Sequence, residues 1–238
     1  MCHNGSVCSN QRISIRFTVG GLFILATLLT AAIAIGLQFF FTKQIATENA
    51  LSSYNSMSKA VSRHIRNVDE DAIATTRLLS QIGSTGKFDS KESNIEILQV
   101  MAEVMRNNSH FYSLYIASKD DTFFQLINLE SSRIIREKID ATKEDRWVQI
   151  KIFNKENKRV KETYYFTDGF KLRYKKEELS NYFPTKRPWY ETAGKGETFK
   201  TTPYLFQHLK ITGQTYSIIV PNTRSVLGVD IILSSISY

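Results

Sequence analysis

The sequence predicts an α+β fold in which helices come first and an antiparallel sheet follows. Apolar residues recur at three- and four-residue steps as far as Arg106, which is typical of helices, and then alternate with polar residues in short runs, which is typical of strands. The chain has 238 residues, of which 42% are hydrophobic and 12% aromatic. This composition indicates a globular protein with a core rather than a disordered chain.

Residues 17–42 (FTVGGLFILATLLTAAIAIGLQFFFT) carry no charged side chain and predict a transmembrane helix. At ~1.5 Å per residue, this stretch is longer than the ~30 Å hydrocarbon core of a bilayer. Arg12 and Arg16 precede it, and no acidic residue does. The positive-inside rule therefore predicts a cytoplasmic tail at residues 1–16, an anchor in the bacterial inner membrane, and a periplasmic region at residues 43–238.

A cleaved signal peptide is the alternative interpretation of this stretch, because Ala32, Ile33 and Ala34 resemble a cleavage site. The apolar run continues beyond these residues and is too long for the apolar region of an ordinary signal peptide. An uncleaved anchor is therefore the favoured interpretation.

The net charge of +8 and the two cysteines bear on other functional classes. Positive charge suits nucleic-acid binding, but the basic residues form no single tract, and an exported region does not normally meet nucleic acid. Cys2 and Cys8 both precede the anchor, so no disulfide is expected in the exported part. Their spacing, even together with His3, matches no known zinc pattern.

Residues 43–85 predict a long helix that follows the anchor. Its apolar stripe, at three- and four-residue steps, includes Tyr54, Met57, Val61 and Ile65. Such a stripe either pairs with another copy of the chain, as in a homodimer, or packs on the domain of its own chain.

Residues 92–238 predict a compact module with one more helix, at about 93–106, and a sheet. The least regular segment of this module is 180–204. Runs of alternating residues, separated by polar turns, predict six strands at 111–117, 122–129, 146–153, 159–166, 215–221 and 225–233.

No catalytic motif is recognisable in the sequence. There is no Gly-x-Ser-x-Gly turn, no phosphate-binding glycine loop and no His-Glu-x-x-His helix. The four histidines, at positions 3, 64, 110 and 208, are dispersed. The sequence therefore predicts a protein that is not an enzyme and that has no metal and no cofactor; a membrane-anchored hydrolase is the least favoured alternative.

The segment YFPTKRPWY, residues 182–190, concentrates prolines, positive charges and aromatic side chains. One interpretation is structural: Pro184 and Pro188 stiffen a turn whose aromatic residues pack inward. The other is a binding pocket, because the planar guanidinium of Arg187 in an aromatic setting suits bidentate capture of a carboxylate. Asp230 is an acid within an otherwise apolar run, and a charged residue there either lies solvated at a strand end or faces a polar cavity.

The order of these parts resembles the double Cache (dCache) sensors, which are extracytoplasmic domains of bacterial chemoreceptors, sensor kinases and cyclic-dinucleotide enzymes. The resemblance rests on TKRPWYETA (185–193), TTPYLF (201–206) and LGVDIILSSI (227–236), which follow an anchor and a long helix. It implies that residues 92–238 form a PAS-like membrane-distal module that binds an amino acid or a related small carboxylate.

In the amino-acid-binding branch of this family, Tyr, Arg, Trp, Tyr and a later Asp bind the ligand, and this sequence has the same residue types in that order. The resemblance implies that Arg187 and Trp189 hold the ligand carboxylate and that Asp230 takes its ammonium group. Many relatives have Asp where Phe183 stands, and often an acid where Phe206 stands. The phenylalanine at 206 disfavours a purely amine ligand here. The expected ligand-binding residues are Tyr182, Arg187, Trp189, Tyr190, Tyr204 and Asp230.

A dCache receptor continues with a membrane-proximal module, a second membrane crossing and an output domain. The resemblance therefore implies that this chain is the truncated N-terminal part of a receptor, whose parent is an HD-GYP or diguanylate cyclase type enzyme, a chemoreceptor or a sensor kinase. The alternative hypothesis is a membrane-anchored interaction module that dimerises through the long helix and binds no small molecule.

Overall fold

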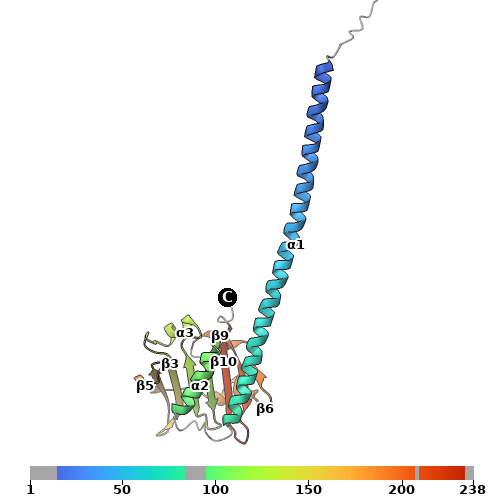
Figure 1. The fold of residues 1–238 in the computed structure, drawn as a ribbon. Coiled ribbons are helices and arrows are strands. Elements are labelled where there is room, and N and C mark those ends of the chain that lie inside the picture. The colour runs from blue at the N-terminus through green and yellow to red at the C-terminus, as the bar shows by residue number, and fades with distance from the viewer. Residues whose placement is uncertain (1–14, 84–94, 207–208, 234–238) are drawn as a thin grey trace, which may run out of the picture. The chain divides into compact units, whose positions relative to one another are not determined.

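The computed structural model of the chain describes residues 15–83, 95–206 and 209–233. The chain divides into two compact units, Met1–Ser62 and Arg63–Tyr238. Helix α1, Ile15–Ile82, includes both the apolar stretch and the amphipathic stretch expected after it (Figure 1). The cysteines at positions 2 and 8 and the histidines at 3 and 208 lie outside the described residues.

The first unit contains the membrane-anchor candidate. An 18-residue window of α1 has a mean hydropathy of 2.2, and none of that window is buried. Among the residues that the structure describes, α1 is the one helix long and apolar enough to cross a membrane. Insertion into a membrane is a prediction from length and composition.

The second unit confirms the predicted α+β fold. Besides the end of α1 it contains helices α2 (Ile95–Asn107), α3 (Arg133–Lys138) and α4 (Pro188–Glu191), and a 3-10 turn, η2, at Pro184–Lys186. The strands are β1 (Phe111–Ala117), β2 (Phe123–Asn128), β3 (Trp147–Lys155), β4 (Lys158–Phe166), β5 (Leu172–Leu179), β6 (Gly194–Lys195), β7 (Phe199–Lys200), β8 (Tyr204–Phe206), β9 (Ile211–Ile219) and β10 (Val226–Ile232).

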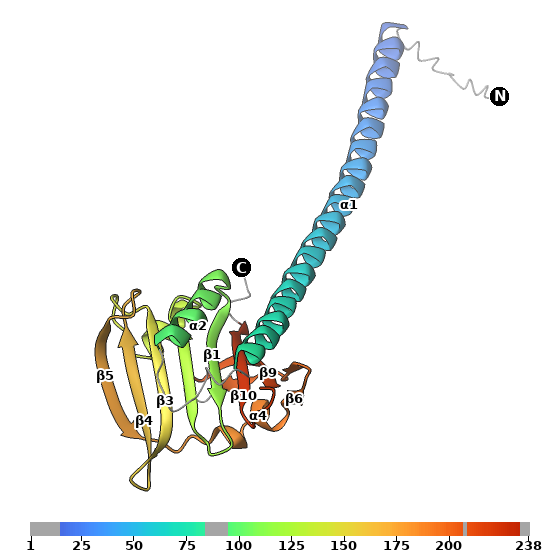
Figure 2. The ribbon, with the colours of Figure 1, turned by 60° about the horizontal axis from the view of Figure 1, so that its bottom comes forward.

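These strands form one sheet in the order β5-β4-β3-β2-β1-β10-β9-β6, and β7 and β8 also pair with β9 (Figures 1 and 2). Neighbouring strands are antiparallel, except that β6 pairs with β9 in parallel. The sequence predicted the six strands β1–β4, β9 and β10, and it did not predict β5 to β8. The first and last strands, β1 and β10, are therefore adjacent in the middle of the sheet.

The two faces of the sheet have separate hydrophobic cores. One core contains side chains of α2 and of the end of α1, including Val68, Ala72 and Leu79, packed on the strands; Figure 2 shows α2 lying across this face. The other core contains side chains of the segment after β5, including Tyr182 and Trp189. The segment with the proline and aromatic motif thus covers the sheet face opposite α1 and α2.

The end of α1 is attached to the sheet by polar contacts as well. The Tyr216 hydroxyl, on β9, donates a hydrogen bond to the Asp69 carboxylate of α1. The Lys200 ammonium, on β7, lies 2.8 Å from the same carboxylate. Apolar packing and these contacts together join the end of α1 to the sheet, with the polar contacts at β7 and β9.

A β-bulge in β1 breaks the regular alternation of side chains. The register between β1 and β10 shifts between Phe111, which pairs with Ile231, and Ser113, which pairs with Asp230. A bulge lets two successive residues face the same side of a sheet. Here Tyr112 belongs to the core beneath the motif, and the Ser113 hydroxyl reaches Asp230 on that same side.

Candidate ligand-binding site

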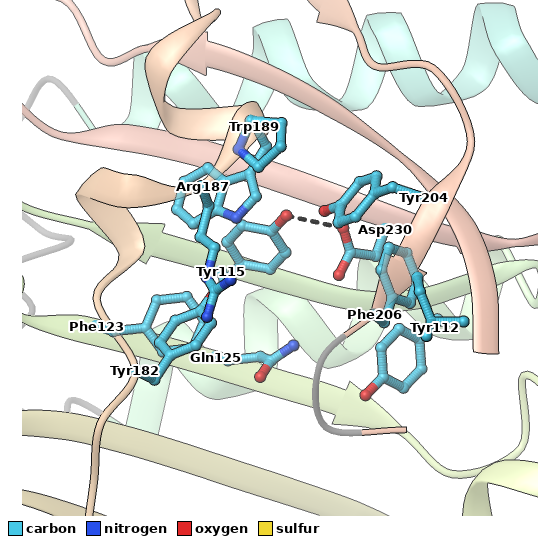
Figure 3. A pocket seen from close by; sticks show the side chains of 12 residues that line it. Tyr112, Tyr115, Phe123, Gln125, Tyr182, Arg187, Trp189, Tyr204, Phe206 and Asp230 are labelled. Atoms are coloured by element: carbon cyan, nitrogen blue, oxygen red, sulfur yellow. Dashed lines mark hydrogen bonds between the residues drawn. The ribbon is translucent and has the colours of Figure 1, made fainter. Parts of the chain in front are cut away.

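A cavity of about 230 Å³ lies within the second unit, between the sheet and the segment that carries the motif (Figure 3). It is smaller than the ~300–1,000 Å³ typical of sites for drug-sized ligands, so it has room only for a smaller molecule. Twelve residues line it: Tyr112, Tyr115, Phe123, Gln125, Tyr182, Arg187, Pro188, Trp189, Tyr204, Leu205, Phe206 and Asp230.

Asp230 lies at the sheet side of the cavity and accepts hydrogen bonds from three hydroxyl groups. The donors are Thr215 at 2.5 Å, Tyr115 at 2.7 Å and Ser113 at 3.1 Å (Figure 3 shows the Tyr115 bond). Ser113 and Thr215 are its register partners on the two neighbouring strands, β1 and β9. The sheet pairing itself therefore places the donors around the carboxyl group.

Burial raises the pKa of the Asp230 carboxyl to about 7, although its hydrogen bonds with Thr215, Tyr115 and Ser113 act in the opposite direction. The residue is only 5% exposed, and no cationic side chain in the described residues forms an ion pair with it. A buried carboxylate without a counter-charge is unfavourable. An ammonium group in the cavity would supply the missing charge.

The tyrosines around Asp230 remain hydrogen-bond donors at neutral pH. Burial raises the pKa values of Tyr115 and Tyr204, and the nearby Asp230 charge raises them further. The Tyr204 hydroxyl lies 2.7 Å from the Thr215 hydroxyl, so it belongs to the same network as Asp230.

Arg187 faces the cavity from a junction between two short helices. It follows η2 and immediately precedes α4, in extended backbone conformation with φ −105° and ψ 145°. Pro188 starts α4, and its fixed φ suits the first position of a helix. The amides of Tyr190 and Glu191 both donate to the Arg187 carbonyl, which fixes the backbone at this point.

The Arg187 side chain is half-buried and has no carboxylate partner among the described residues. Its guanidinium carbon lies 4.8 Å from the centre of the Tyr182 ring, an aromatic contact that orients the planar group. Its Nε is buried without a hydrogen-bond partner. The guanidinium therefore has donors left for a ligand.

Two residues that the sequence analysis did not single out hold the motif in place. The Asp121 carboxylate, in the turn between β1 and β2, accepts hydrogen bonds from the Thr185 amide (3.1 Å) and hydroxyl (2.6 Å). The Arg159 guanidinium donates to the carbonyls of Tyr182 (2.7 Å) and Asp121 (2.5 Å). Only the folded sheet brings these residues together, so spacing in the sequence gave no signal.

Trp189 is 2% exposed and forms an aromatic wall of the cavity. Its ring centre lies 4.7 Å from that of Tyr115, in an edge-on arrangement, and 6.4 Å from that of Phe123. Trp189 and Arg187 come from the same turn and lie together in Figure 3.

Tyr190 differs from the expectation, because it does not line the cavity. Its hydroxyl donates to the Arg224 carbonyl at 3.0 Å. Successive side chains on a helix point about 100° apart, so α4 directs Trp189 into the cavity and its neighbour away from it. The other five expected residues, Tyr182, Arg187, Trp189, Tyr204 and Asp230, all line the cavity.

Gln125 is a lining residue that the sequence analysis missed. It is 4% exposed, and its amide nitrogen donates to the Ser113 hydroxyl at 2.9 Å. Its amide oxygen is buried without a hydrogen-bond donor. A polar residue inside the apolar strand FFQLIN is the same kind of signal that identified Asp230, so the sequence did contain a clue.

One small aromatic cavity contains the Arg187 guanidinium and the Asp230 carboxyl group, neither of which forms an ion pair with a described residue, and the Gln125 amide oxygen, which has no hydrogen-bond donor. Such a site can bind a ligand that has both a carboxylate and an amine. In the described ranges no three histidine, cysteine or acidic side chains are grouped to hold a metal ion.

Comparison with known proteins found structural neighbours only. No protein-family model matches the sequence. No curated protein matches it significantly.

Three of the solved structures to which the chain is similar are sensory domains or a chemotaxis protein. The sensory domain of the Campylobacter jejuni chemoreceptor Tlp3 (CcmL) has 16% identity and a TM-score of 0.46 over 82% of this chain and 66% of its own. The ligand-binding domain of the same receptor in complex with L-valine has 17% identity and a TM-score of 0.46, over 82% and 65%. A protein named methyl-accepting chemotaxis protein X has 16% identity and a TM-score of 0.43, over 76% and 62%. The chain thus spans less than two thirds of the length of each of these structures.

Proposed function

We propose that this chain is a membrane-anchored, extracytoplasmic sensor domain of the double Cache type and that it binds an amino acid or a closely related carboxylate-bearing amine. Its role is to sense a ligand rather than to catalyse a reaction, as part of a bacterial signal-transduction receptor. In this proposal Arg187 and Trp189 hold the ligand carboxylate, Asp230 holds the ammonium group, and Tyr182 and Tyr204 complete the cavity.

The observation that carries this proposal is the pair of opposite, uncompensated charges in one cavity. Arg187 and Asp230 both line the cavity and form an ion pair neither with each other nor with another described residue. Burying either charge alone is unfavourable, and a zwitterionic ligand would compensate both. The unpaired oxygen of Gln125 would accept a further hydrogen from the ammonium group.

A thermal-shift screen of the full chain in detergent micelles tests this proposal. We expect at least one of the common amino acids to raise the midpoint of unfolding in a concentration-dependent way. A ligand at a hundred times its dissociation constant stabilises the folded state by ~2.7 kcal/mol. If the protein is folded and no amino acid shifts the midpoint, the cavity does not bind this class of ligand.

The membrane arrangement is a further part of the proposal. The apolar part of α1 would cross the inner membrane once, with the arginines that precede it in the cytoplasm and the second unit in the periplasm. Protease added to intact spheroplasts should then digest the chain after Lys43. Resistance to protease until the cells are lysed would place that part inside the cell and contradict this arrangement.

An interaction module that dimerises through α1 is the second candidate function. Along α1, the apolar residues Leu51, Tyr54, Met57, Val61 and Ile65 are 43–72% exposed and repeat at three- and four-residue steps. A second copy of the helix would cover such a stripe. This candidate assigns no ligand to Arg187, so substitution of Arg187 separates it from the sensor proposal.

A further inference from the structure

The part of the cavity that the proposed carboxylate and ammonium contacts leave free has no charged side chain. Arg187 and Asp230 are the ionisable side chains of the described lining that can carry a charge near neutral pH. The other ionisable lining residues are tyrosines, which stay neutral because burial raises their pKa values: Tyr112, Tyr115, Tyr182 and Tyr204. If these two groups hold the carboxylate and the amine of an amino acid, the remaining lining meets only its side chain.

An aromatic pair forms the wall of this remaining space. The rings of Tyr112 and Phe206 are stacked, with centroids 5.7 Å apart and planes 21° apart, and both residues are buried. Figure 3 shows the pair on the far side of Asp230 from Arg187. The Tyr204 ring meets Phe206 edge-on at 5.2 Å, so the wall continues toward the polar network.

A glycine on β9 makes room for this wall. Gly213 pairs with Tyr204 of β8, and a Cβ atom at Gly213 would lie 2.3 Å from the Phe206 ring and 2.6 Å from the Ile231 carbonyl oxygen. Real Cβ atoms do not approach other atoms so closely, and any larger residue here would displace the Phe206 ring. The bulge in β1 thus directs the Tyr112 ring into the wall, and Gly213 leaves room for the Phe206 ring of β8.

We propose that this cavity selects α-amino acids with an uncharged, apolar side chain and that Phe206, stacked on Tyr112, is the residue that determines this specificity. The inference rests on the proposed function and narrows its ligand class. A third charge on the ligand would enter an aromatic space in which the described lining offers no counter-charge, which is strongly unfavourable. An apolar side chain would instead bury its surface against the two rings.

Calorimetric titration of the full chain in detergent micelles tests the selectivity. Leucine, valine and phenylalanine are compared with aspartate, glutamate, lysine and arginine. We expect every charged amino acid to bind at least ~100-fold more weakly than the best apolar one. A charged amino acid that binds as tightly as the best apolar one would overturn this inference and leave the proposed function in place, whereas binding of no amino acid would remove both.

Substitution of Phe206 tests the residue itself. In Phe206→Ala the wall is lost, and we expect valine to lose at least ~10-fold in affinity while phenylalanine loses less, because the larger side chain fills the new space. Phe206→Leu keeps most of the side-chain volume and replaces the alanine variant in this test if that variant is unfolded. In it, valine should again lose more affinity than phenylalanine, but both losses should be smaller. Phe199→Ala, on β7, is the matched control, because Phe199 is partly exposed and lies outside the lining. Equal losses for both ligands in both Phe206 variants would contradict the assignment.

Discussion

Replacement of Arg187 by alanine is expected to weaken amino-acid binding at least ~30-fold, because the ligand carboxylate then remains buried without its partner, at a cost of ~2–5 kcal/mol. The unfolding midpoint of the empty protein should change little. Arg187 makes no ion pair in the described part of the chain, and its aromatic contact with Tyr182 contributes on the order of 1 kcal/mol. Arg187→Lys keeps the positive charge but lacks the planar guanidinium. Its affinity for the ligand should therefore lie between that of the unmodified protein and that of Arg187→Ala.

The control for these variants is Lys186→Ala, which removes an exposed cation from the neighbouring position of the same turn. It should leave the affinity unchanged, because Lys186 does not line the cavity. Calorimetric titration measures all the affinities. If Arg187→Ala binds its ligand within threefold of the unmodified protein, Arg187 is a structural residue, as the interaction-module proposal requires.

Asp230→Asn is expected to abolish ligand binding and, at pH 8, to stabilise the empty protein. The carboxyl group is buried, and at that pH it is ionised with no cation beside it. A neutral amide of the same shape removes the cost of that charge, so we expect the free energy of unfolding to rise by ~1–3 kcal/mol. Urea denaturation measures this change. Glu191→Gln, which neutralises an exposed carboxylate on α4, should change neither affinity nor stability.

The same group predicts how pH acts on the protein. The pKa of Asp230 is raised from its ordinary value of 3.8 to about 7 in the folded state, so between these values the folded protein binds more protons than the unfolded chain. The contribution of Asp230 to stability therefore falls as pH rises from about 4 to about 7, by ~1.4 kcal/mol for each pH unit within that window.

Ligand affinity should change in the opposite direction. An ammonium ligand requires the ionised carboxylate, so the apparent affinity should fall about tenfold per pH unit below pH 7 and level off above it. Titrations at several pH values check this. In Asp230→Asn the pH dependence of stability assigned to this group should disappear. A pH-independent affinity between pH 5 and 8 would show that Asp230 does not bind the ligand amine.

Which strands could be predicted from the sequence depended on how much of each strand is buried. β1 and β2 are buried along their whole length, and polar turns at their ends marked them clearly. β5 (LRYKKEEL) was missed, because it is an exposed edge strand without apolar alternation. Its pairing with β4 places oppositely charged side chains together, such as Glu178 with Lys161 at 2.9 Å. This ion pair forms only in the folded sheet, so the sequence pattern did not indicate it.

The candidate site shows a similar division. Asp230 stood out as an acid in an apolar strand, and the motif around Arg187 stood out by composition. The bulge that turns Tyr112 and Ser113 toward the same side left no trace in the residue pattern. The hydrogen bonds that Thr185 donates to Asp121 join positions 64 residues apart, which no local pattern can show. Long-range geometry, rather than residue type, therefore limited the sequence analysis.

The central claim is that one small molecule brings a carboxylate to Arg187 and an ammonium group to Asp230. Calorimetric titration at pH 8 tests this claim most directly. Three matched compounds are compared: the best-binding amino acid, the amine that lacks its carboxylate, and the acid that lacks its amine. The account predicts that the amino acid binds and that each single-charge compound binds at least ~100-fold more weakly, because one buried charge then stays uncompensated. Binding of the acid or the amine as tightly as the amino acid would contradict it.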